Sequence, residues 1–326
     1  MDWIQILGNT GASILSPVTF AFILASLGLA LHFGYGGLLN FGIAGFMAIG
    51  AYGYAISVLS FGFPWWGGML VGLVGSVILA LIMGIPTLRL RGDYMAIVTI
   101  ATAEILRLMF LTVTFRPITG SADGLSEFNV DFRASNPLPV GSYGFGPWTY
   151  TEGELWTRIF SLIVVIVCVI LLWALMRSPW GRVVKGIRED EDAVRALGKN
   201  VFAYKMQVLI IGGLFASLGG IVYALPSNVQ PTVYATSLTF FVWTALLLGG
   251  AATIFGPVLG SIIFWILQAV ISNILPAMVQ AGLLPFLSVS QSFTLRFILV
   301  GIGLMLLVIF RPQGILGDKR ELTFVK

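Results

Sequence analysis

Few side chains in this sequence could carry out acid–base, nucleophilic or metal chemistry. The chain has one histidine, His32, and one cysteine, Cys168. A single cysteine excludes an intramolecular disulfide and a multi-cysteine zinc site. A lone histidine near a helix end is more often a hydrogen-bonded structural residue than a metal ligand, and a cysteine inside an apolar run is usually a small buried side chain. We therefore predict no catalytic residue and no metal ligand.

The charged side chains are concentrated in one stretch, SPWGRVVKGIREDEDAVRALGKN, at 178–200. It carries nine of the chain's 32 charged residues, which are 18 Lys and Arg plus 14 Asp and Glu. Ser178 and Pro179 form a helix-start signal. The acids at 189–192 precede two bases, an order that suits the dipole of a short helix. Two apolar stripes follow helical spacing, Val183, Val184 and Ile187 in one and Val194, Leu197 and Val201 in the other.

This pattern predicts two short amphipathic helices, and two interpretations of them stay open. The stretch could be a solvated loop with no partner. Alternatively, the membrane surface or a soluble partner could cover its apolar stripes, because exposed apolar stripes flanked by charge need a surface to cover them.

Glu104 is the one acid well inside a predicted membrane span. A carboxylate in a membrane is costly and usually faces a cavity or a partner. Arg107 follows one helical turn later, which allows an ion pair within the helix. The functional interpretation is a pathway-lining carboxylate that meets a substrate ammonium or amide. We favour the structural one, which is a charge pair inside the bundle or an arginine that snorkels to the interface.

Two glycine-rich interruptions, GGLLNFG at 36–42 and GGAATIFG at 249–256, share a GG…FG frame. Transporter sites tend to lie where helices are interrupted at corresponding places in two halves. The opened backbone would then offer carbonyl and amide groups to a polar solute at Asn40, Phe41 and Gly42 and at Gly249 and Gly250. The alternative is that both stretches are turns at the cytoplasmic surface.

Composition places these residues in a membrane protein. The chain of 326 residues is 58% hydrophobic and 10% charged, and its mean hydropathy is +0.97. A soluble domain carries about 25% charged residues, so lipid must solvate much of the surface. Backbone polar groups in lipid must be satisfied within the segment, and the apolar runs are longer than the strands of a membrane barrel. We predict an all-α polytopic membrane protein with a compact, glycine-rich bundle.

Membrane spans need about 20 mostly apolar residues, and the sequence predicts about nine of them. The predicted spans are 15–33, 41–60, 66–88, 95–113, 159–176, 205–225, 236–252, 257–280 and 295–311. Small residues at a four-residue spacing predict close helix packing, at Gly68/Gly72, Gly212/Ala216/Gly220 and Gly256/Gly260.

Lys and Arg in the loops indicate the orientation, because they mark the cytoplasmic side. They are frequent at 177–205 and in the tail 312–326, whereas 114–158 carries more acids than bases. We predict one membrane domain over 1–326, with 114–158 as an extracytoplasmic loop, 177–205 as a cytoplasmic loop and 312–326 as a cytoplasmic tail.

Five stretches carry a family resemblance. Within 178–205, Asp192-Ala193-Val194 and Gly198 have the spacing of the degenerate EAA…G loop of ABC importer permeases. Four others agree with it in order, LNFGIAGFMAIGAY at 39–52, LRLRGDYMAIVTIATAEILRL at 88–108, LLLGGAATIFGPVLG at 246–260 and RPQGILG at 311–317. Together they resemble the permeases of branched-chain amino acid ABC importers, the LivM-type family, over nearly the whole chain.

The resemblance implies a transmembrane subunit of an ATP-driven importer in the bacterial cytoplasmic (inner) membrane. Its partners would be a second homologous permease subunit, two cytoplasmic ATP-binding subunits, an extracytoplasmic substrate-binding protein and the lipid bilayer. The loop at 177–205 would hold the coupling helix, which contacts the ATPase through Arg188, Glu189, Asp190, Glu191, Asp192, Ala193, Val194, Arg195, Leu197 and Gly198. The chain lacks a G-x-x-x-x-G-K-[ST] phosphate loop. We therefore expect a transporter subunit with no enzyme activity and no bound cofactor, whose partners hold ATP and Mg²⁺.

Other functions stay open as alternatives. The same family includes permeases for urea and short amides, so the substrate could be such an amide instead of a branched-chain or other hydrophobic amino acid. An ion-coupled secondary transporter would need several acids or amides near the midplane, where only Glu104 and Gln268 lie. A membrane enzyme would need clustered histidines or acids. The net charge of +4 is spread over several loops, which favours membrane topology over nucleic-acid binding.

Overall fold

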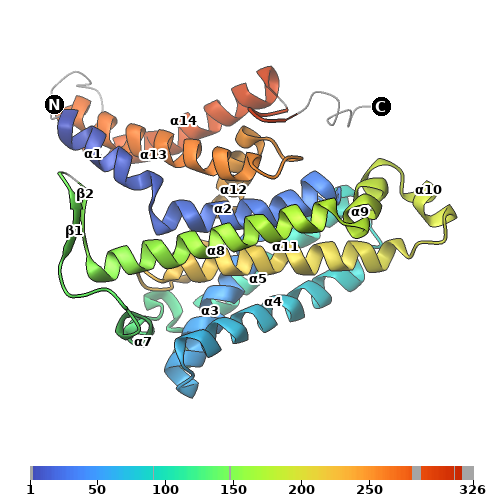
Figure 1. The fold of residues 1–326 in the computed structure, drawn as a ribbon, viewed down its shortest axis with the longest axis horizontal. Helices are drawn as coiled ribbons and strands as arrows, with labels where there is room; N and C mark the ends of the chain where they lie inside the picture. The colour runs from blue at the N-terminus through green and yellow to red at the C-terminus, as the bar shows by residue number, and fades with distance from the viewer. Residues whose placement is uncertain (1–2, 91, 147, 281–287, 312, 318–326) are drawn as a thin grey trace.

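The computed structural model describes residues 3–90, 92–146, 148–280, 288–311 and 313–317 (Figure 1). Within these ranges seven helices are long and apolar enough to cross a membrane. They are α2 (Pro17–Leu29) with its π-helical continuation η1 (Ala30–Tyr35), α3 (Ile43–Phe61), α4 (Trp65–Thr87), α5 (Gly92–Leu111), α8 (Glu152–Arg177), α11 (Val201–Ala224) and α13 (Gly256–Gln280). The prediction of an all-α polytopic membrane protein is confirmed.

The predicted count of nine spans is not confirmed. The predicted span 236–252 corresponds to α12 (Thr236–Gly249), whose 14 residues are too short for a full crossing at 1.5 Å per residue. The predicted span 295–311 lies in α14 (Val289–Phe310). Its described apolar stretch, Thr294–Gly303, is shorter than a full crossing. A further helix that the sequence analysis did not anticipate, α1 (Trp3–Ile14), precedes α2.

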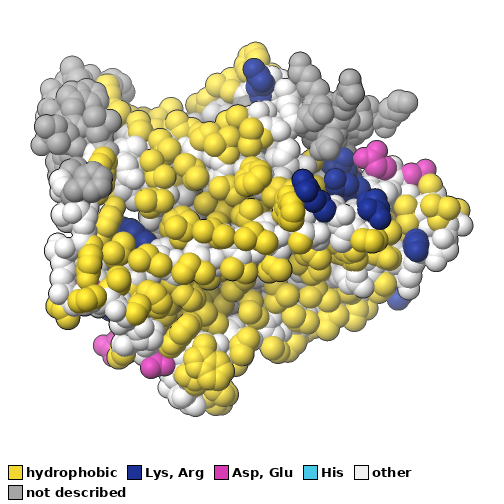
Figure 2. All heavy atoms as spheres, viewed as in Figure 1, with side chains coloured by type: hydrophobic (Ala, Val, Ile, Leu, Met, Phe, Trp, Pro, Cys, Tyr) yellow, Lys and Arg dark blue, Asp and Glu magenta, His cyan; other side chains and the backbone are white. Residues whose placement is uncertain are grey.

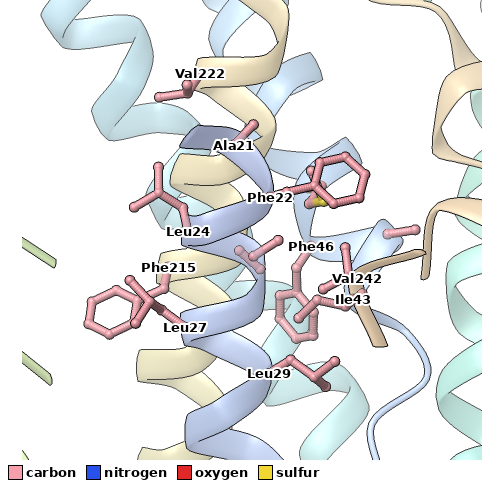
Figure 3. Close-up of a cluster of buried hydrophobic side chains, with 14 of the residues drawn as sticks. Ala21, Phe22, Leu24, Leu27, Leu29, Ile43, Phe46, Phe215, Val222 and Val242 are labelled. Atoms are coloured by element: carbon pink, nitrogen blue, oxygen red, sulfur yellow. The ribbon is translucent and has the colours of Figure 1, made fainter. Parts of the chain in front are cut away.

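The centre of the bundle is formed by α2, α3 and α11, and buried side chains surround α2 on every side (Figure 3). A helix that is apolar all round is expected to be buried in this way. Glycines permit the close crossings, because a Cβ at Gly220 of α11 would overlap the carbonyl oxygen of Met47 in α3. The predicted small-residue packing at Gly212/Ala216/Gly220 is therefore confirmed.

One end of the bundle, here called the hairpin end, is covered by short elements (Figure 1). They are η2 (Val113–Phe115), α6 (Arg116–Thr119), η3 (Ser121–Asp123), α7 (Val130–Ala134) and the antiparallel pair β1 (Ser142–Phe145) and β2 (Trp148–Thr151). Buried Asn129 fastens this cover to α11, because its amide donates to the carbonyl oxygens of Ala224 and Leu225 at 3.1 and 2.8 Å. The predicted loop 114–158 is thus a folded cover. It ends at Thr151, where a capping box starts α8.

The opposite end, here called the α9–α10 end, carries α9 (Pro179–Glu189) and α10 (Glu191–Ala196). Figure 2 shows that Lys and Arg side chains gather at this end and that hydrophobic side chains cover the middle of the visible face. Between the ends, η4 (Pro231–Tyr234) leads from the hairpin end into α12. The basic side chains at one end and the hydrophobic middle fit a bundle whose middle is surrounded by lipid.

Candidate functional site

The α9–α10 unit consists of the two short amphipathic helices that the sequence predicted. Ser178 caps α9, and its hydroxyl accepts from the amide of Gly181. Asp190 caps α10, and one carboxylate oxygen accepts from the amides of Asp192 and Ala193, both at 3.0 Å. Gly198 follows α10 with φ of 75°, a left-handed conformation that glycine adopts without steric cost. A Cβ there would have no atom within 4 Å.

The apolar stripes of this unit are covered mainly by each other. Ile187, Val194 and Val201 form a buried cluster, with Val183 and Tyr204 packed against it. The expectation that both stripes need an external surface is wrong for these residues, because α9, α10 and the start of α11 bury them together. Leu197 is the exception, since 78% of it is exposed beside Gly198.

The charges of the unit divide into an internal group and an outward group. Glu191 pairs with Arg195 at 2.9 Å and also with Lys205, which ties α10 to α11. Asp192 and Glu189 point outward with mostly exposed side chains, although each also pairs with an arginine of the unit. The outward carboxylates and Leu197 are therefore exposed on the α9–α10 unit and accessible to a partner.

Arg188 connects the α9–α10 unit to the membrane-spanning bundle. Its side chain is only 8% exposed, and its guanidinium donates to the carbonyl oxygen of Gly34, near the end of η1. A Cβ at Gly37 would lie 3.2 Å from Cγ of the same arginine. A movement of α9 would therefore act directly on the segment 34–42.

The segment 38–42 is a non-helical interruption held inside the bundle by one hydrogen-bond network. The Nε2 of His32 donates to the carbonyl oxygen of Leu209 at 3.1 Å, which leaves Nδ1 to accept from the Asn40 amide at 3.0 Å. The carbonyl oxygen of Asn40 accepts from the indole of Trp243 at 3.3 Å, and its side-chain oxygen accepts from the amide of Gly42 at 2.7 Å. The network joins η1, α11 and α12, and Asn40 is fully buried.

This network uses the carbonyl oxygen of Asn40 and the amide of Gly42, two of the backbone groups that the sequence offered to a solute. The amide of Phe41 is also used, because it donates to the Thr99 hydroxyl of α5 at 3.0 Å. What Phe41 offers instead is its ring, which stacks on Trp243 with centroids 4.7 Å apart and approaches Phe240 at 6.0 Å.

The second interruption, at Gly249 and Gly250, is likewise internally satisfied. The amides of Ile315 and Leu316 donate to the carbonyl oxygens of Leu248 and Gly249 at 2.9 and 3.0 Å, so the segment after α14 caps the end of α12. The second interruption contacts η1, since a Cβ at Gly34 would overlap the carbonyl oxygen of Ala251. Sequence reasoning anticipated the two breaks but not this contact.

Glu104 and Arg107 form the in-helix ion pair that the spacing allows. The arginine Nε lies 3.0 and 2.9 Å from the two carboxylate oxygens, and Thr236 at the start of α12 also reaches Glu104. The pair is not sealed inside the chain, because the side chains of Glu104 and Arg107 are 37% and 18% exposed. Of the seven spans, α5 is the least buried. Inside the protein, 11% of its apolar 18-residue stretch is buried, against 67% for α11.

Sequence reasoning missed three contributors to these sites, Thr99, Trp243 and Thr236. Each acts through a partner far away in sequence, so no local pattern signals it. Across the described ranges, no group of three or more His, Cys, Asp and Glu side chains is arranged to hold a metal ion.

Comparison with known proteins places this geometry in a family. A family model described as "Branched-chain amino acid transport system / permease component" matches residues 13–309. The high-affinity branched-chain amino acid permease protein LivM of Salmonella typhimurium is 31% identical over 96% of this chain and 71% of that protein. A probable LivM of Methanocaldococcus jannaschii is 24% identical over 93% of this chain and 92% of that protein. The nucleoside ABC transporter permease NupC of Lactococcus lactis is 24% identical over 70% of this chain and 72% of that protein.

Proposed function

Because the chain belongs to the family of branched-chain amino acid transport permeases, we propose that it is the membrane subunit of a binding-protein-dependent ABC importer for branched-chain or other hydrophobic amino acids. In this proposal it lies in the bacterial cytoplasmic membrane with the α9–α10 end in the cytoplasm. A second homologous permease, two ATP-binding subunits and an extracytoplasmic binding protein complete the importer. ATP and Mg²⁺ bind to the ATPase subunits.

The observation that carries the proposal is the path from the α9–α10 unit to the intramembrane interruption. Leu197, Gly198 and the outward carboxylates offer the ATPase an apolar contact flanked by charge. Arg188 passes the movement of the unit to Gly34. From there it reaches Asn40 and Trp243 through η1. A rigid unit anchored at one buried side chain can move an interrupted segment as one body.

The proposed pathway runs along the exposed side of α5 and α12. Lipid solvates a partly exposed Glu104–Arg107 pair poorly, so we infer that this side faces water or another protein. Thr236 and Phe240 lie one turn apart on α12, the first beside Glu104 and the second beside Phe41. A surface with a carboxylate, a guanidinium and aromatic rings suits a zwitterion with an apolar side chain. Gly249 and Gly250 lie at the far end of α12 from Thr236, against α13 and residues 313–317.

Nucleosides are the alternative substrate class, because a nucleoside permease is among the relatives. Aromatic rings such as Phe41 and Phe240 could stack on a base as well as contact an aliphatic side chain. The ion pair favours the amino acid, since a nucleoside has no opposite charges to match it. A urea or short-amide substrate would make little use of the aromatic rings.

The test is ATP-driven uptake of radiolabelled leucine by the complete importer in proteoliposomes. We expect competition by isoleucine and valine and none by adenosine or urea. Replacing both Glu104→Gln and Arg107→Gln leaves no unpaired charge, so we expect normal insertion and uptake lowered about tenfold, equivalent to about 1.4 kcal/mol. Full uptake by this double variant would show that the ion pair does not take part in the pathway. Competition by adenosine alone would reassign the substrate.

A further inference from the structure

A cavity of about 930 Å³ opens at the α9–α10 end. The ends of α4 and α5 border it on one side, and α9, α10 and the start of α11 border it on the other. Its apolar lining includes Leu38, Leu88, Met95 and Ile187, all largely buried. Because membrane-spanning helices begin and end around it, the cavity lies at the depth where lipid head groups meet the protein.

The charged lining of the cavity is strongly basic. Five basic side chains and one acid give it a net charge of +4, from Arg89, Arg188, Arg195, Lys199 and Lys205 against Glu191. Glu191 already binds Arg195 and Lys205. In the part of the chain that the structure describes, no carboxylate pairs with Arg89 or Lys199. The guanidinium of Arg89 instead lies 5.8 Å from the ring centroid of Phe202. A cavity with this positive charge is expected to bind an anion.

The apolar surface beside the cavity indicates which kind of anion. The last turns of α4 expose Ile82 and Ile85, and Phe202 is exposed at the start of α11. These side chains lie next to the basic lining in sequence and on the membrane side of it. A ligand with a phosphate at one end and hydrocarbon at the other would use both surfaces, whereas a soluble phosphate would use only the first.

We propose that this cavity binds the phosphate head group of an anionic phospholipid, with the acyl chains along α4. Arg89 and Lys199 supply the unpaired charge for the phosphate. The same cavity is lined by Arg188 and Glu191 of the α9–α10 unit. A bound lipid therefore bridges that unit and the ends of the membrane helices, and lipid composition becomes a means of controlling how firmly the unit is held.

The test uses the purified full-length chain and counts bound lipids by native mass spectrometry. Phosphatidylglycerol and phosphatidylcholine with identical acyl chains are compared, and inorganic phosphate is added in a separate arm. We expect retention of phosphatidylglycerol over phosphatidylcholine. The affinity should fall about fivefold for each cation removed in the Arg89→Gln and Lys199→Gln variants, alone and combined. The matched control, Arg177→Gln with Arg182→Gln, removes two basic side chains outside the cavity and should bind as wild type does.

A second pair of variants separates charge from folding. Arg89→Lys with Lys199→Arg keeps both charges and should retain the lipid even if the glutamine variants prove unstable. Equal retention of the two lipids by the wild-type chain would overturn the proposal, as would equal loss in the cavity and control variants. Displacement of phosphatidylglycerol by millimolar inorganic phosphate would assign the cavity to a soluble anion. Loss of ATPase binding alone in the glutamine variants, with lipid binding unchanged, would assign it to an acidic side chain of the partner.

Discussion

At the residue scale, the molecule depends on a few polar side chains that each join distant segments. His32 is the clearest case, because its two ring nitrogens connect the carbonyl oxygen of Leu209 to the amide of Asn40. The sequence analysis gave it a structural role, and the hydrogen bonds agree with that prediction. Arg188 works in the same way between α9 and η1. Removing either side chain would leave buried polar groups without partners, which costs more than the lost hydrogen bond itself.

Gly198 allows a test at this scale that separates backbone strain from contact with a partner. Any side chain there adopts a left-handed conformation at a cost of about 1 kcal/mol. Because a Cβ has no atom within 4 Å, Gly198→Ala and Gly198→Trp should fold alike. We expect Gly198→Ala to keep most ATP-driven uptake and Gly198→Trp to lose about tenfold or more, equivalent to about 1.4 kcal/mol, because the indole occupies the space of the ATPase.

The measurement is uptake together with co-purification of the ATPase subunits. Equal uptake by the two Gly198 variants would show that no partner lies against this surface. Leu197→Ala is the companion change, and because Leu197 is exposed we expect weaker ATPase binding with unchanged thermal stability.

At the element scale, small residues decide how closely α2, α3 and α11 approach. Lipid gives helices no hydrophobic reason to associate, so close backbone contact supplies the packing energy. The crossing of α11 and α3 at Gly220 and Met47 and that of α2 and α11 at Gly28 and Gly212 both exclude a side chain. These crossings hold in register the helices on either side of Asn40, which are α2 with its continuation η1, where His32 lies, and α3.

We predict that Gly220→Leu destabilises the bundle by about 3 kcal/mol, the upper end of typical overpacking costs. Gly303→Leu in α14 is the matched control, since a Cβ there meets nothing within 4 Å, and it should be nearly neutral. The thermal unfolding midpoint of each purified variant in the same detergent measures the difference. Similar midpoints for both variants would mean that the α3–α11 crossing contributes little to stability.

At the scale of the whole molecule, the two ends differ in charge and in construction. The hairpin end is a folded cover fastened through Asn129, and the α9–α10 end gathers basic side chains beside a large cavity. The positive-inside rule orients such a molecule with its basic end in the cytoplasm. In the proposed orientation, Leu197 and Gly198 lie within reach of a cytoplasmic ATPase.

Labelling of introduced cysteines tests this orientation. The natural Cys168 is buried and should not react, so Cys168→Ala provides a background free of thiols. In right-side-out vesicles, a membrane-impermeant maleimide should label Val140→Cys at the hairpin end and leave Leu197→Cys unlabelled until the membrane is opened. Both native side chains are strongly exposed, so access to the thiol depends on the side of the membrane. Labelling in the reverse order would invert the proposed topology.

The sequence by itself determined the features that depend on local pattern. Apolar runs of sufficient length predict the long helices of a membrane protein, since backbone groups in lipid must bond within their own segment. The start signal at Ser178-Pro179 predicts α9 and α10 for the same local reason, together with two apolar stripes, Val183, Val184 and Ile187 in one and Val194, Leu197 and Val201 in the other. The spacing of Glu104 and Arg107 predicts their ion pair.

Only the tertiary structure decided which of these groups bond or pack within the chain and which stay exposed to a partner. The apolar stripes of α9 and α10 cover one another because the chain turns back at Asp190, and this leaves Leu197 exposed. The backbone at Asn40 is occupied by Trp243, and that at Gly249 by Leu316, residues that no periodicity connects to them. Arg89 and Lys199 likewise come to line one cavity only after α4 and α11 pack. Contacts between segments distant in the chain depend on how whole helices cross, and helix crossing is settled by packing, which local sequence does not encode.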